Sequence, residues 1–331
     1  MTHLLQRNAL VSAFLLLALC AMAQGPNNSG TYYSSADGKK GSALKTALAS
    51  IINDHTALSY KSLWTHFRTT DARADGKVWD MYSGTSNFTF GTDQAGTYKQ
   101  EGDVYNREHS FPKSWFNDAS PMVTDLMHIV PTDGYVNGRR SNYPFGETDS
   151  PTYQSDGGFS KLGPSSTDGY TGTVFEPNDE YKGDFARIYF YMVTCYESNV
   201  SNWSSDMLAG NKYPAFKTWA LNLLLKWAKE DPVSEKEINR NKAVYSVQGN
   251  RNPFVDYPGL EQYVWGDMTS TSFSYDNYAN PTAIEMVVAE PATVDVYTTT
   301  GVKVRSGVDR QQATDGLSHG VYIVGGKKVM H

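Results

Sequence analysis

Apolar residues recur at helical spacing in several stretches of the chain, and these stretches predict its main helices. Three segments have this pattern or are apolar on nearly every side, residues 41–53, 183–197 and 213–230, and a fourth helix is predicted from its end signals at residues 234–249. The second of them is apolar nearly all round and predicts a buried helix. The last begins with Ser234-x-x-Glu237, a capping box, and stops at Gly249, so both of its ends are encoded in the sequence.

Other stretches alternate between apolar and polar residues, which is typical of strands. Residues 77–84 predict a strand that runs into a turn, and residues 87–96 predict a strand and a loop. Near the C-terminus, residues 294–307 and 320–331 predict strands joined by turns. Helices and strands in this order indicate an α+β fold followed by a small β-sandwich.

The length of 331 residues favours about two domains, at roughly 150 residues each. We expect a signal peptide at 1–23, a main domain at 24–267, a Ser/Thr/Asn-rich linker at 268–280 and a small β-rich domain at 281–331. No other segment is long and apolar enough to span a membrane.

The N-terminal segment has the three parts of a secretory signal. Arg7 precedes an apolar stretch, and Ala21-Met22-Ala23 forms an A-x-A cleavage site. Lipidation at Cys20 is disfavoured because Leu19 precedes it where a small residue is expected. The protein is therefore expected outside the cell or attached to its surface, after passing through the periplasm. The mature chain keeps one cysteine, Cys195, which cannot form an internal disulfide and reads as a buried apolar residue.

Composition excludes some classes of function. Hydrophobic residues make up 40% of the chain and charged residues 19%, which argues against disorder. The net charge of −6 argues against a module that coats nucleic acid non-specifically, because such modules are basic. A polyanionic partner would have to be bound by a local basic patch or through a cation.

The densest polar chemistry lies in two segments, YNREHSFPKSWF at 105–116 and TDLMHIVPTDGYVNGRRSNYPFGE at 124–147. Their pattern predicts a strand, a long connection, a second strand and a short helix. A Glu-His pair alone is usually a surface turn. Here Glu108 and His109 stand beside Arg107, and an imidazole suits proton transfer from water at neutral pH.

Phosphodiester hydrolysis would use this set of residues. Mg²⁺ prefers oxygen ligands and keeps several waters, so one carboxylate and one amide oxygen can suffice. Glu108 and Asn137 can supply that pair, with Asn142 as a rival amide. The scissile phosphate can be held by an arginine, and the candidates are Arg107, Arg139 and Arg140.

These segments resemble the endonuclease I family, which comprises secreted or periplasmic nucleases with a ββα-metal (His-Me finger) active site. The resemblance is carried by REH, VNGRRSNYPFG and QGNRNPF in this order, and it covers about residues 31–265. The chain departs from the family at Met127, where many members have a histidine. It also lacks the disulfides that hold some members together.

The resemblance assigns roles to individual residues. It implies His109 as general base, Glu108 and Asn137 as metal ligands, and Arg140 as the group that stabilises the phosphate. Mg²⁺ is the expected cation, with Ca²⁺ and Mn²⁺ as alternatives. Apart from the resemblance, nucleic-acid contacts are expected from Arg107, Arg139 and Asn142, with a solvated surface residue as the alternative for Arg139. Support from behind the ligands is expected from His128, Glu176, Arg187 and Asn250, and the alternative for the last three is that they brace the fold.

The family typically cuts DNA, and often RNA, with little sequence preference, and leaves 5′-phosphate ends. We therefore expect a monomeric, secreted endonuclease. The alternative is an extracellular nucleic-acid-binding or adhesive protein that keeps the fold without the activity. A zinc protease fits less well, because the sequence has no H-E-x-x-H.

The C-terminal segment carries a second resemblance. VDVYTTTGVKVRSG and LSHGVYIVGGKKVMH are similar to the C-terminal sorting domain of the type IX secretion system, a small β-sandwich that addresses proteins for export. The resemblance implies the type IX machinery as a partner. An ordinary β-rich accessory domain is the alternative.

Overall fold

Two compact units make up the chain, Met1–Thr282 and Ala283–His331. The structure is a computed structural model that describes residues 24–280, 293–298, 302–309, 312–318, 321–324 and 327–330. The signal peptide expected at residues 1–23 lies outside the described residues. Each unit is described by itself below.

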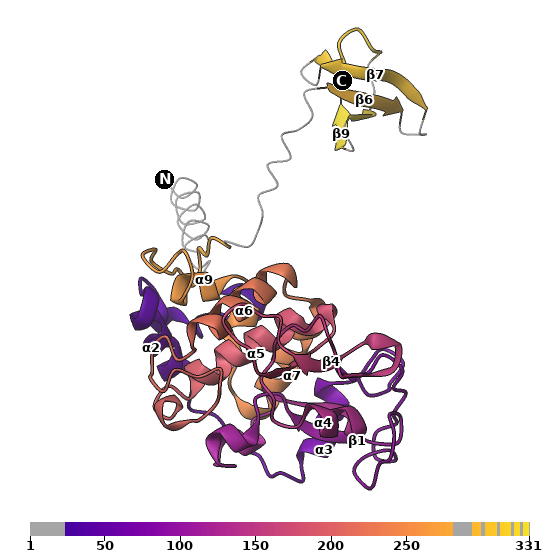
Figure 1. The fold of residues 1–331 in the computed structure, drawn as a ribbon. Helices are drawn as coiled ribbons and strands as arrows, with labels where there is room; N and C mark the ends of the chain where they lie inside the picture. Colours follow the sequence, from indigo (N-terminus) through magenta and orange to yellow (C-terminus); the bar gives the residue numbers. More distant parts are fainter. Residues whose placement is uncertain are drawn as a thin grey trace, which may run out of the picture. The chain divides into compact units, whose positions relative to one another are not determined.

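Four long helices form the frame of the first unit and confirm the helices predicted from the sequence. They are α2 (Gly41–Ile52), α5 (Lys182–Cys195), α6 (Thr218–Glu230) and α7 (Glu235–Gln248). Every residue of α5 is buried, and α5 packs against α2 and α6 in the middle of the unit (Figure 1). The capping box of α7 is present, and Gly249 ends that helix in a left-handed conformation at φ 84°.

Shorter helices connect this frame. The α-helices are α3 (Leu63–Thr70), α4 (Gly134–Arg140), α8 (Pro253–Asp256) and α9 (Leu260–Val264). The 3₁₀ helices are Pro26–Asn28, Ser34–Ala36, Lys113–Phe116, Met122–Thr124, Asp156–Gly158, Asp179–Tyr181 and Val200–Asn202. None of the helices in the described part of the chain has the length and apolar character needed to cross a bilayer.

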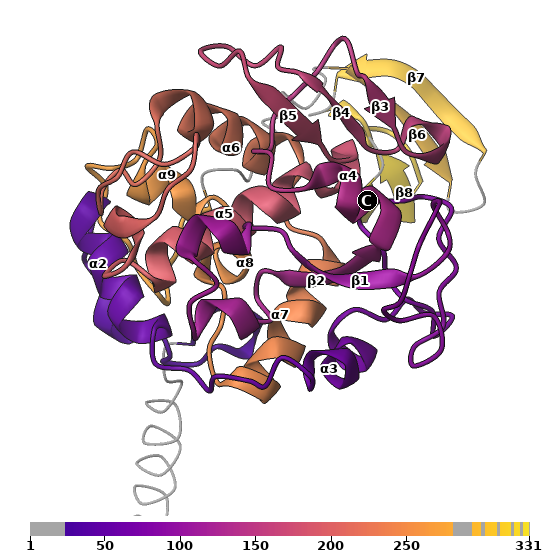
Figure 2. The same ribbon diagram turned by 60° about the horizontal axis from the view of Figure 1, so that its bottom comes forward.

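A two-stranded sheet followed by a short helix positions the residues of interest. Strand β1 (Tyr105–His109) pairs antiparallel with β2 (Ile129–Asp133), and α4 begins at the next residue. Figure 2 shows α4 beside the two strands. The side chain of Asp133 caps α4, because it accepts hydrogen bonds from the backbone N–H groups of Tyr135 at 2.8 Å and Val136 at 3.0 Å. The order of elements expected for residues 105–147 is therefore found.

The strands expected in residues 77–84 and 87–96 are not formed. The chain there makes turns and bends. In the first segment the carboxylate of Asp80 accepts from the Tyr82 N–H at 2.8 Å and the Ser86 hydroxyl at 2.6 Å, and in the second the carboxylate of Asp93 accepts from the Thr89 N–H at 2.7 Å. Such local bonds compete with a strand ladder. The other sheet of this unit has the order β3-β4-β5, with strands Tyr153–Gln154, Lys161–Pro164 and Thr173–Glu176.

Residues 268–280 were expected to be a linker, and the structure corrects this. Phe273 is 1% exposed and belongs to the core of the first unit. Its backbone bonds to Gly38 at 2.8 Å and to Lys39 at 2.8 Å, and the Tyr278 hydroxyl donates to the Pro258 carbonyl at 2.8 Å. The aromatic residues within this polar segment hold it against the first unit.

The second unit contains one antiparallel sheet of order β7-β6-β8-β9. Its strands are Thr293–Thr298 (β6), Lys303–Asp309 (β7), Val321–Val324 (β8) and Lys327–Met330 (β9). Val294, Val296 and Tyr322 are among the residues of its small core. The strands expected here are present, whereas the second layer of a β-sandwich is not seen among the described residues.

Candidate active site

A cavity of about 320 Å³ opens at the C-terminal end of β1. Glu108 and His109 from β1 and Asn137 from α4 all line it. Pairing of β1 with β2 is what joins them, because α4 follows β2 directly. The fold therefore brings together the three residues on which the predicted chemistry depends. The remaining lining residues are Tyr60, Arg107, Pro112, Lys113, Ser114, Asp118, Arg140, Ser141 and Asn142.

His109 is held by a backbone carbonyl. Its Nε2 lies 3.1 Å from the carbonyl oxygen of Val123, which can only accept, so Nε2 carries the proton and Nδ1 keeps its lone pair. Burial lowers the pKa of His109 to about 3, and the imidazole of His128 adds to the effect. The His109 ring is thus neutral at pH 7 and its Nδ1 lone pair is free to accept a proton, although a pKa this far below 7 makes it a weaker base than an unperturbed imidazole.

Glu108 lies on the other side of the strand end and is fixed by two donors. The Tyr82 hydroxyl and the Arg140 Nη1 each donate to its Oε1 at 2.8 Å. Burial raises the pKa of the Glu108 carboxyl, while the Arg140 guanidinium and the Tyr82 hydroxyl act in the opposite direction. Neighbouring residues of a strand face opposite sides, but both side chains reach the cavity because β1 ends at His109.

Arg140 was expected to contact the phosphate, and the structure points to a different role. It is 1% exposed, and its Nη2 donates to the Ser110 carbonyl at 2.6 Å and to the Tyr189 hydroxyl at 3.3 Å. Its Nη1 also donates to the His109 carbonyl at 3.1 Å. Because protein acceptors take these donors, Arg140 fixes Glu108 and the end of β1 and is poorly placed to bind a phosphate.

Arg107 is the arginine that faces the cavity from β1. Its guanidinium carbon lies 3.7 Å from the ring centroid of Tyr60 and 4.4 Å from that of Trp64, and its Nη1 donates to the Tyr60 carbonyl at 2.7 Å. The Tyr60 ring also stacks on His109, with centroids 6.0 Å apart and an interplanar angle of 19°. Arg107 and His109 are two residues apart and lie on the same face of β1. The Tyr60 ring contacts both side chains and keeps them apart.

The two amide candidates, Asn137 and Asn142, both line the cavity. Asn137 lies within α4, whose N-terminus is capped, whereas Asn142 follows the helix and its Nδ2 donates to the Ser114 hydroxyl at 3.4 Å. Arg139 lies outside the cavity lining, and its guanidinium carbon is 4.9 Å from the ring centroid of Tyr135. Arg139 is therefore an exposed arginine packed on an aromatic side chain.

His128 is the one residue of the expected supporting group that lies beside the site. Its ring centroid is 5.5 Å from that of His109, and its Nε2 donates to the Met122 carbonyl at 2.7 Å. It is fully buried, so it can shape the surroundings of His109 without reaching the cavity.

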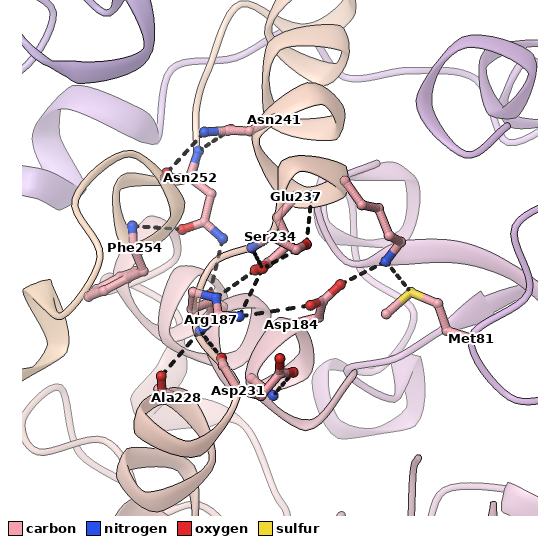
Figure 3. A network of polar contacts seen from close by, with 12 residues as sticks. Met81, Asp184, Arg187, Ala228, Asp231, Ser234, Glu237, Asn241, Asn252 and Phe254 are labelled. Carbon is pink, nitrogen blue, oxygen red and sulfur yellow. Dashed lines mark hydrogen bonds and ion pairs between the residues drawn. The ribbon is translucent and has the colours of Figure 1, made fainter. Parts of the chain in front are cut away.

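Glu176, Arg187 and Asn250 brace other parts of the unit. Arg187 bonds to Glu237 at 2.8 Å and to the Asp231 carbonyl at 2.8 Å, which ties α5 to the start of α7 (Figure 3). Glu176 accepts from Lys182 at 2.8 Å, and Asn250 donates to the Ile52 carbonyl at 3.0 Å. These bonds hold the frame and do not involve Glu108, His109 or Asn137, which corrects the expectation that the three residues support the ligands directly.

A second group of potential ligands lies away from the cavity. One ligand atom each of His55, Asp125 and Cys195 lies within 4.8 Å of the others. Asp125 Oδ2 already accepts from the hydroxyl groups of Tyr191 at 2.8 Å and Tyr196 at 2.7 Å. This carboxylate is satisfied by protein donors, so the group fits a buried polar network. Cys195 is buried as expected.

Sequence reasoning missed two residues that hold the site. Tyr82 is 26 positions from Glu108, and Tyr60 is 47 positions from Arg107. Neither tyrosine stands in a local pattern of its own, so no spacing could have found them. The only signal for Tyr60 was that it lies within residues 31–265, which the resemblance covers.

Comparisons with known proteins agree on one family. The model of the family Endonuclease I matches residues 40–259. An extracellular ribonuclease of Bacillus amyloliquefaciens is 36% identical over 244 residues, which cover 71% of this chain and 78% of the relative. An extracellular ribonuclease of Bacillus subtilis (strain 168) is 34% identical over 260 residues, or 76% of this chain and 83% of the relative. A periplasmic deoxyribonuclease of Aeromonas hydrophila is 28% identical over 135 residues, or 41% and 48%.

Proposed function

The chain belongs to the endonuclease I family, and from this premise we propose that it is a secreted, divalent-metal-dependent endonuclease. It would hydrolyse phosphodiester bonds of DNA and RNA with little sequence preference and leave 5′-phosphate ends. In this proposal β1, β2 and α4 are the ββα-metal (His-Me finger) motif. The observation that carries it is the convergence of Glu108, His109 and Asn137 on one cavity.

His109 is the general base of the proposed reaction. With Nε2 bonded to the Val123 carbonyl, Nδ1 has the free lone pair and takes the proton from the attacking water. Tyr60 limits the orientation of the ring by stacking on it. The low pKa of His109, about 3, keeps the base unprotonated at neutral pH.

The oxygen donors fit a hard divalent cation. Glu108 offers a carboxylate and Asn137 an amide oxygen to the same cavity, and Mg²⁺ accepts such a small oxygen set because it keeps its waters. Tyr82 and Arg140 both bond to Oε1 of Glu108, so Oε2 is the oxygen that we assign to the ion. A bound cation would stabilise the negative charge of the transition state and of the leaving oxygen. Mn²⁺ and Ca²⁺ prefer the same ligand type.

Arg107 is the group that we assign to the scissile phosphate. It lines the cavity, and its position is fixed by Tyr60 and Trp64, so little side-chain entropy remains to be lost on binding. Lys113 also lines the cavity, but it forms an ion pair with Asp118. Arg140 acts through Glu108 and is a positioning residue.

A nicking assay tests the proposal. Supercoiled plasmid and a single-stranded RNA are incubated with the mature protein in Mg²⁺, Mn²⁺, Ca²⁺ or EDTA. We expect cleavage of both polymers with Mg²⁺ or Mn²⁺, none with EDTA, and products that a ligase can rejoin because they end in 5′-phosphate. A protein that binds plasmid but leaves it uncut in every cation would support the binding or adhesive alternative.

We also propose that the second unit is a sorting domain of the type IX secretion system and acts with that machinery. Its four-stranded sheet and the sequence pattern of residues 294–307 and 317–331 support this role. The test fuses residues 281–331 to a periplasmic reporter in a bacterium that has the machinery. If the reporter stays in the periplasm while a known cargo is exported, this proposal is wrong.

A further inference from the structure

A second cavity, of about 620 Å³, lies next to the candidate active site. The two cavities share the lining residues Ser114 and Asn142, whose side chains hydrogen-bond at 3.4 Å. A polymer whose phosphate lies beside His109 would therefore extend past these two residues into the second cavity. None of the functions proposed above involves the residues that line its far part.

The second cavity has fewer charged lining residues than the first. Its charged lining residues are Lys217 and Asp206, one of each sign. The others are aromatic residues, Pro144 and small polar residues: Ser114, Trp115, Asn142, Tyr143, Tyr170, Thr173, Ser204 and Ser205. A groove that tracks phosphates is basic, so this cavity suits the uncharged part of a nucleotide.

Tyr143 supplies an open aromatic ring in this cavity. Its side chain is 38% exposed, which makes it one of few exposed large apolar groups among the described residues, and it stands three residues after the end of α4. An exposed ring next to a phosphate site is the arrangement on which nucleobases stack. Tyr143 is also two positions from Ser141, which lines the first cavity.

Another part of the cavity lining is held by fixed contacts. The Tyr170 ring stacks on Trp219, with centroids 4.3 Å apart and an interplanar angle of 10°, and its hydroxyl donates to Asp206 at 2.8 Å. The Trp219 Nε1 donates to the Asp206 carbonyl at 3.2 Å. These contacts fix the Asp206 carboxylate in place, where it can accept from the N–H groups of a base edge.

From these observations we infer that the second cavity binds an unpaired nucleobase next to the scissile phosphate, stacked on Tyr143. This inference rests on the proposed nuclease function and adds the substrate class. A base inside a duplex has both faces covered by its neighbours and its edge paired, so it cannot stack on Tyr143. The enzyme should therefore prefer single-stranded RNA and DNA, or unpaired segments, to duplex.

The test compares a single strand with its duplex and uses Tyr143→Ala and Tyr143→Phe. Loss of one stacked base corresponds to about a 5- to 150-fold fall in kcat/KM, which Tyr143→Ala should show on the single strand. Tyr143→Phe keeps the ring and should keep the rate. Tyr245→Ala is the matched control, because Tyr245 is 42% exposed but lies on α7, away from both cavities.

An abasic substrate separates stacking from other effects of the substitution. A short single strand with one cleavable linkage is made with the base on each side of that linkage removed in turn. In the wild type, removal of one of the two bases should lower kcat/KM as much as Tyr143→Ala does. In Tyr143→Ala, removal of the same base should cause no further fall in kcat/KM. Provided that the wild type cuts the substrate, two results would overturn the inference. One is that the falls in kcat/KM caused by base removal and by Tyr143→Ala are additive, and the other is that Tyr143→Ala cuts the single strand at the wild-type rate. A wild type that cuts neither polymer would instead reject the proposed function.

Discussion

At the residue scale, the candidate site is built from side chains whose partners fix them before any substrate arrives. Glu108 is fixed by Tyr82 and Arg140, and His109 by the Val123 carbonyl and the Tyr60 ring. Residues behind a metal ligand orient it, and their loss typically costs about 10- to 100-fold in metal affinity or activity. The buried hydroxyl of Tyr82 is the simplest such residue to test.

Tyr82→Phe removes one hydrogen bond to Glu108 and keeps the ring in the core. We expect the Mg²⁺ concentration that gives half-maximal cleavage to rise about tenfold. Tyr33→Phe is the control, because the Tyr33 hydroxyl also donates to a buried carboxylate, that of Asp256, at 2.8 Å. Equal Mg²⁺ requirements for the two variants would show that Tyr82 does not orient a ligand.

The sequence predicted the residues that stand together in the motif but not those that hold them. Glu108, His109 and Asn137 could be chosen because their chemistry and order are visible in two short segments. Tyr60 and Tyr82 could not, because their contacts depend on how distant loops return to β1. Arg140 was assigned to the phosphate because the sequence does not show which side chains are buried. In the folded protein Arg140 is buried, and its guanidinium donates to Glu108.

At the element scale, the short helix α4 decides where Asn137 lies. A helix of seven residues is not stable alone, so its position depends on its N-cap and on packing. Asp133 supplies the cap and also accepts from the Gly102 N–H at 2.6 Å. Loss of the cap should therefore affect both stability and metal binding.

Asp133→Ala should lower the free energy of unfolding by about 0.5–2 kcal/mol, and it should weaken the response to Mg²⁺ because Asn137 loses its fixed position. Asp133→Asn keeps a side-chain acceptor and should retain most of both properties. Thermal unfolding and Mg²⁺ titration of cleavage measure the two effects. A stability loss with an unchanged Mg²⁺ response would mean that α4 keeps its place without the cap.

The long helices could be predicted from the sequence, whereas several connecting segments could not. The Ser234 capping box and Gly249 specify the two ends of α7 locally, and the all-round apolar pattern specifies α5. The turn around Asp80 contradicts the strand prediction because side-chain bonds to its carboxylate replace strand pairing. The Asp80 carboxylate also links this turn to β2, because it accepts a hydrogen bond from the Asp133 N–H at 2.8 Å.

At the scale of the whole molecule, the first unit is a helical frame with one large aromatic core. The linker expected at 268–280 shows what composition misses: Phe273 and Tyr278 anchor a stretch that is otherwise rich in Ser, Thr and Asn. The frame also contains buried carboxyl groups, and these make its stability depend on pH. Glu261 is the clearest of them, because neither carboxyl oxygen has a hydrogen-bond partner among the described residues.

Burial raises the pKa of Glu261 from 4.5 to about 7. The folded state then holds this proton more tightly than the unfolded state, so stability is greatest below pH 4.5 and falls as the pH rises toward 7. The loss amounts to about 3 kcal/mol above pH 7. Glu261→Gln cannot lose a proton, so its free energy of unfolding should change less between pH 5 and pH 8 than that of the wild type.

Glu235→Gln is the control for this measurement, because Glu235 is exposed on α7. It should keep the pH dependence of the wild type. Denaturant unfolding at pH 5 and at pH 8 gives the change in the free energy of unfolding for each protein. If the free energy of unfolding of Glu261→Gln changes with pH as much as that of the wild type, the pKa of Glu261 is not raised. Its carboxyl group is then ionised in the folded protein and stabilised by a partner that the described part of the structure does not contain.

The most direct test of the proposed mechanism is the plasmid-cleavage rate of His109→Ala with saturating Mg²⁺, measured beside the wild type and His66→Ala. His66 lies on α3 and is outside the cavity lining, so its variant should cut at the wild-type rate. Loss of the general base should slow His109→Ala by about 10²- to 10⁴-fold while its thermal unfolding stays near that of the wild type. A folded His109→Ala protein that cuts plasmid as fast as the wild type would contradict the assignment of the base, and with it the account of this cavity as the active site.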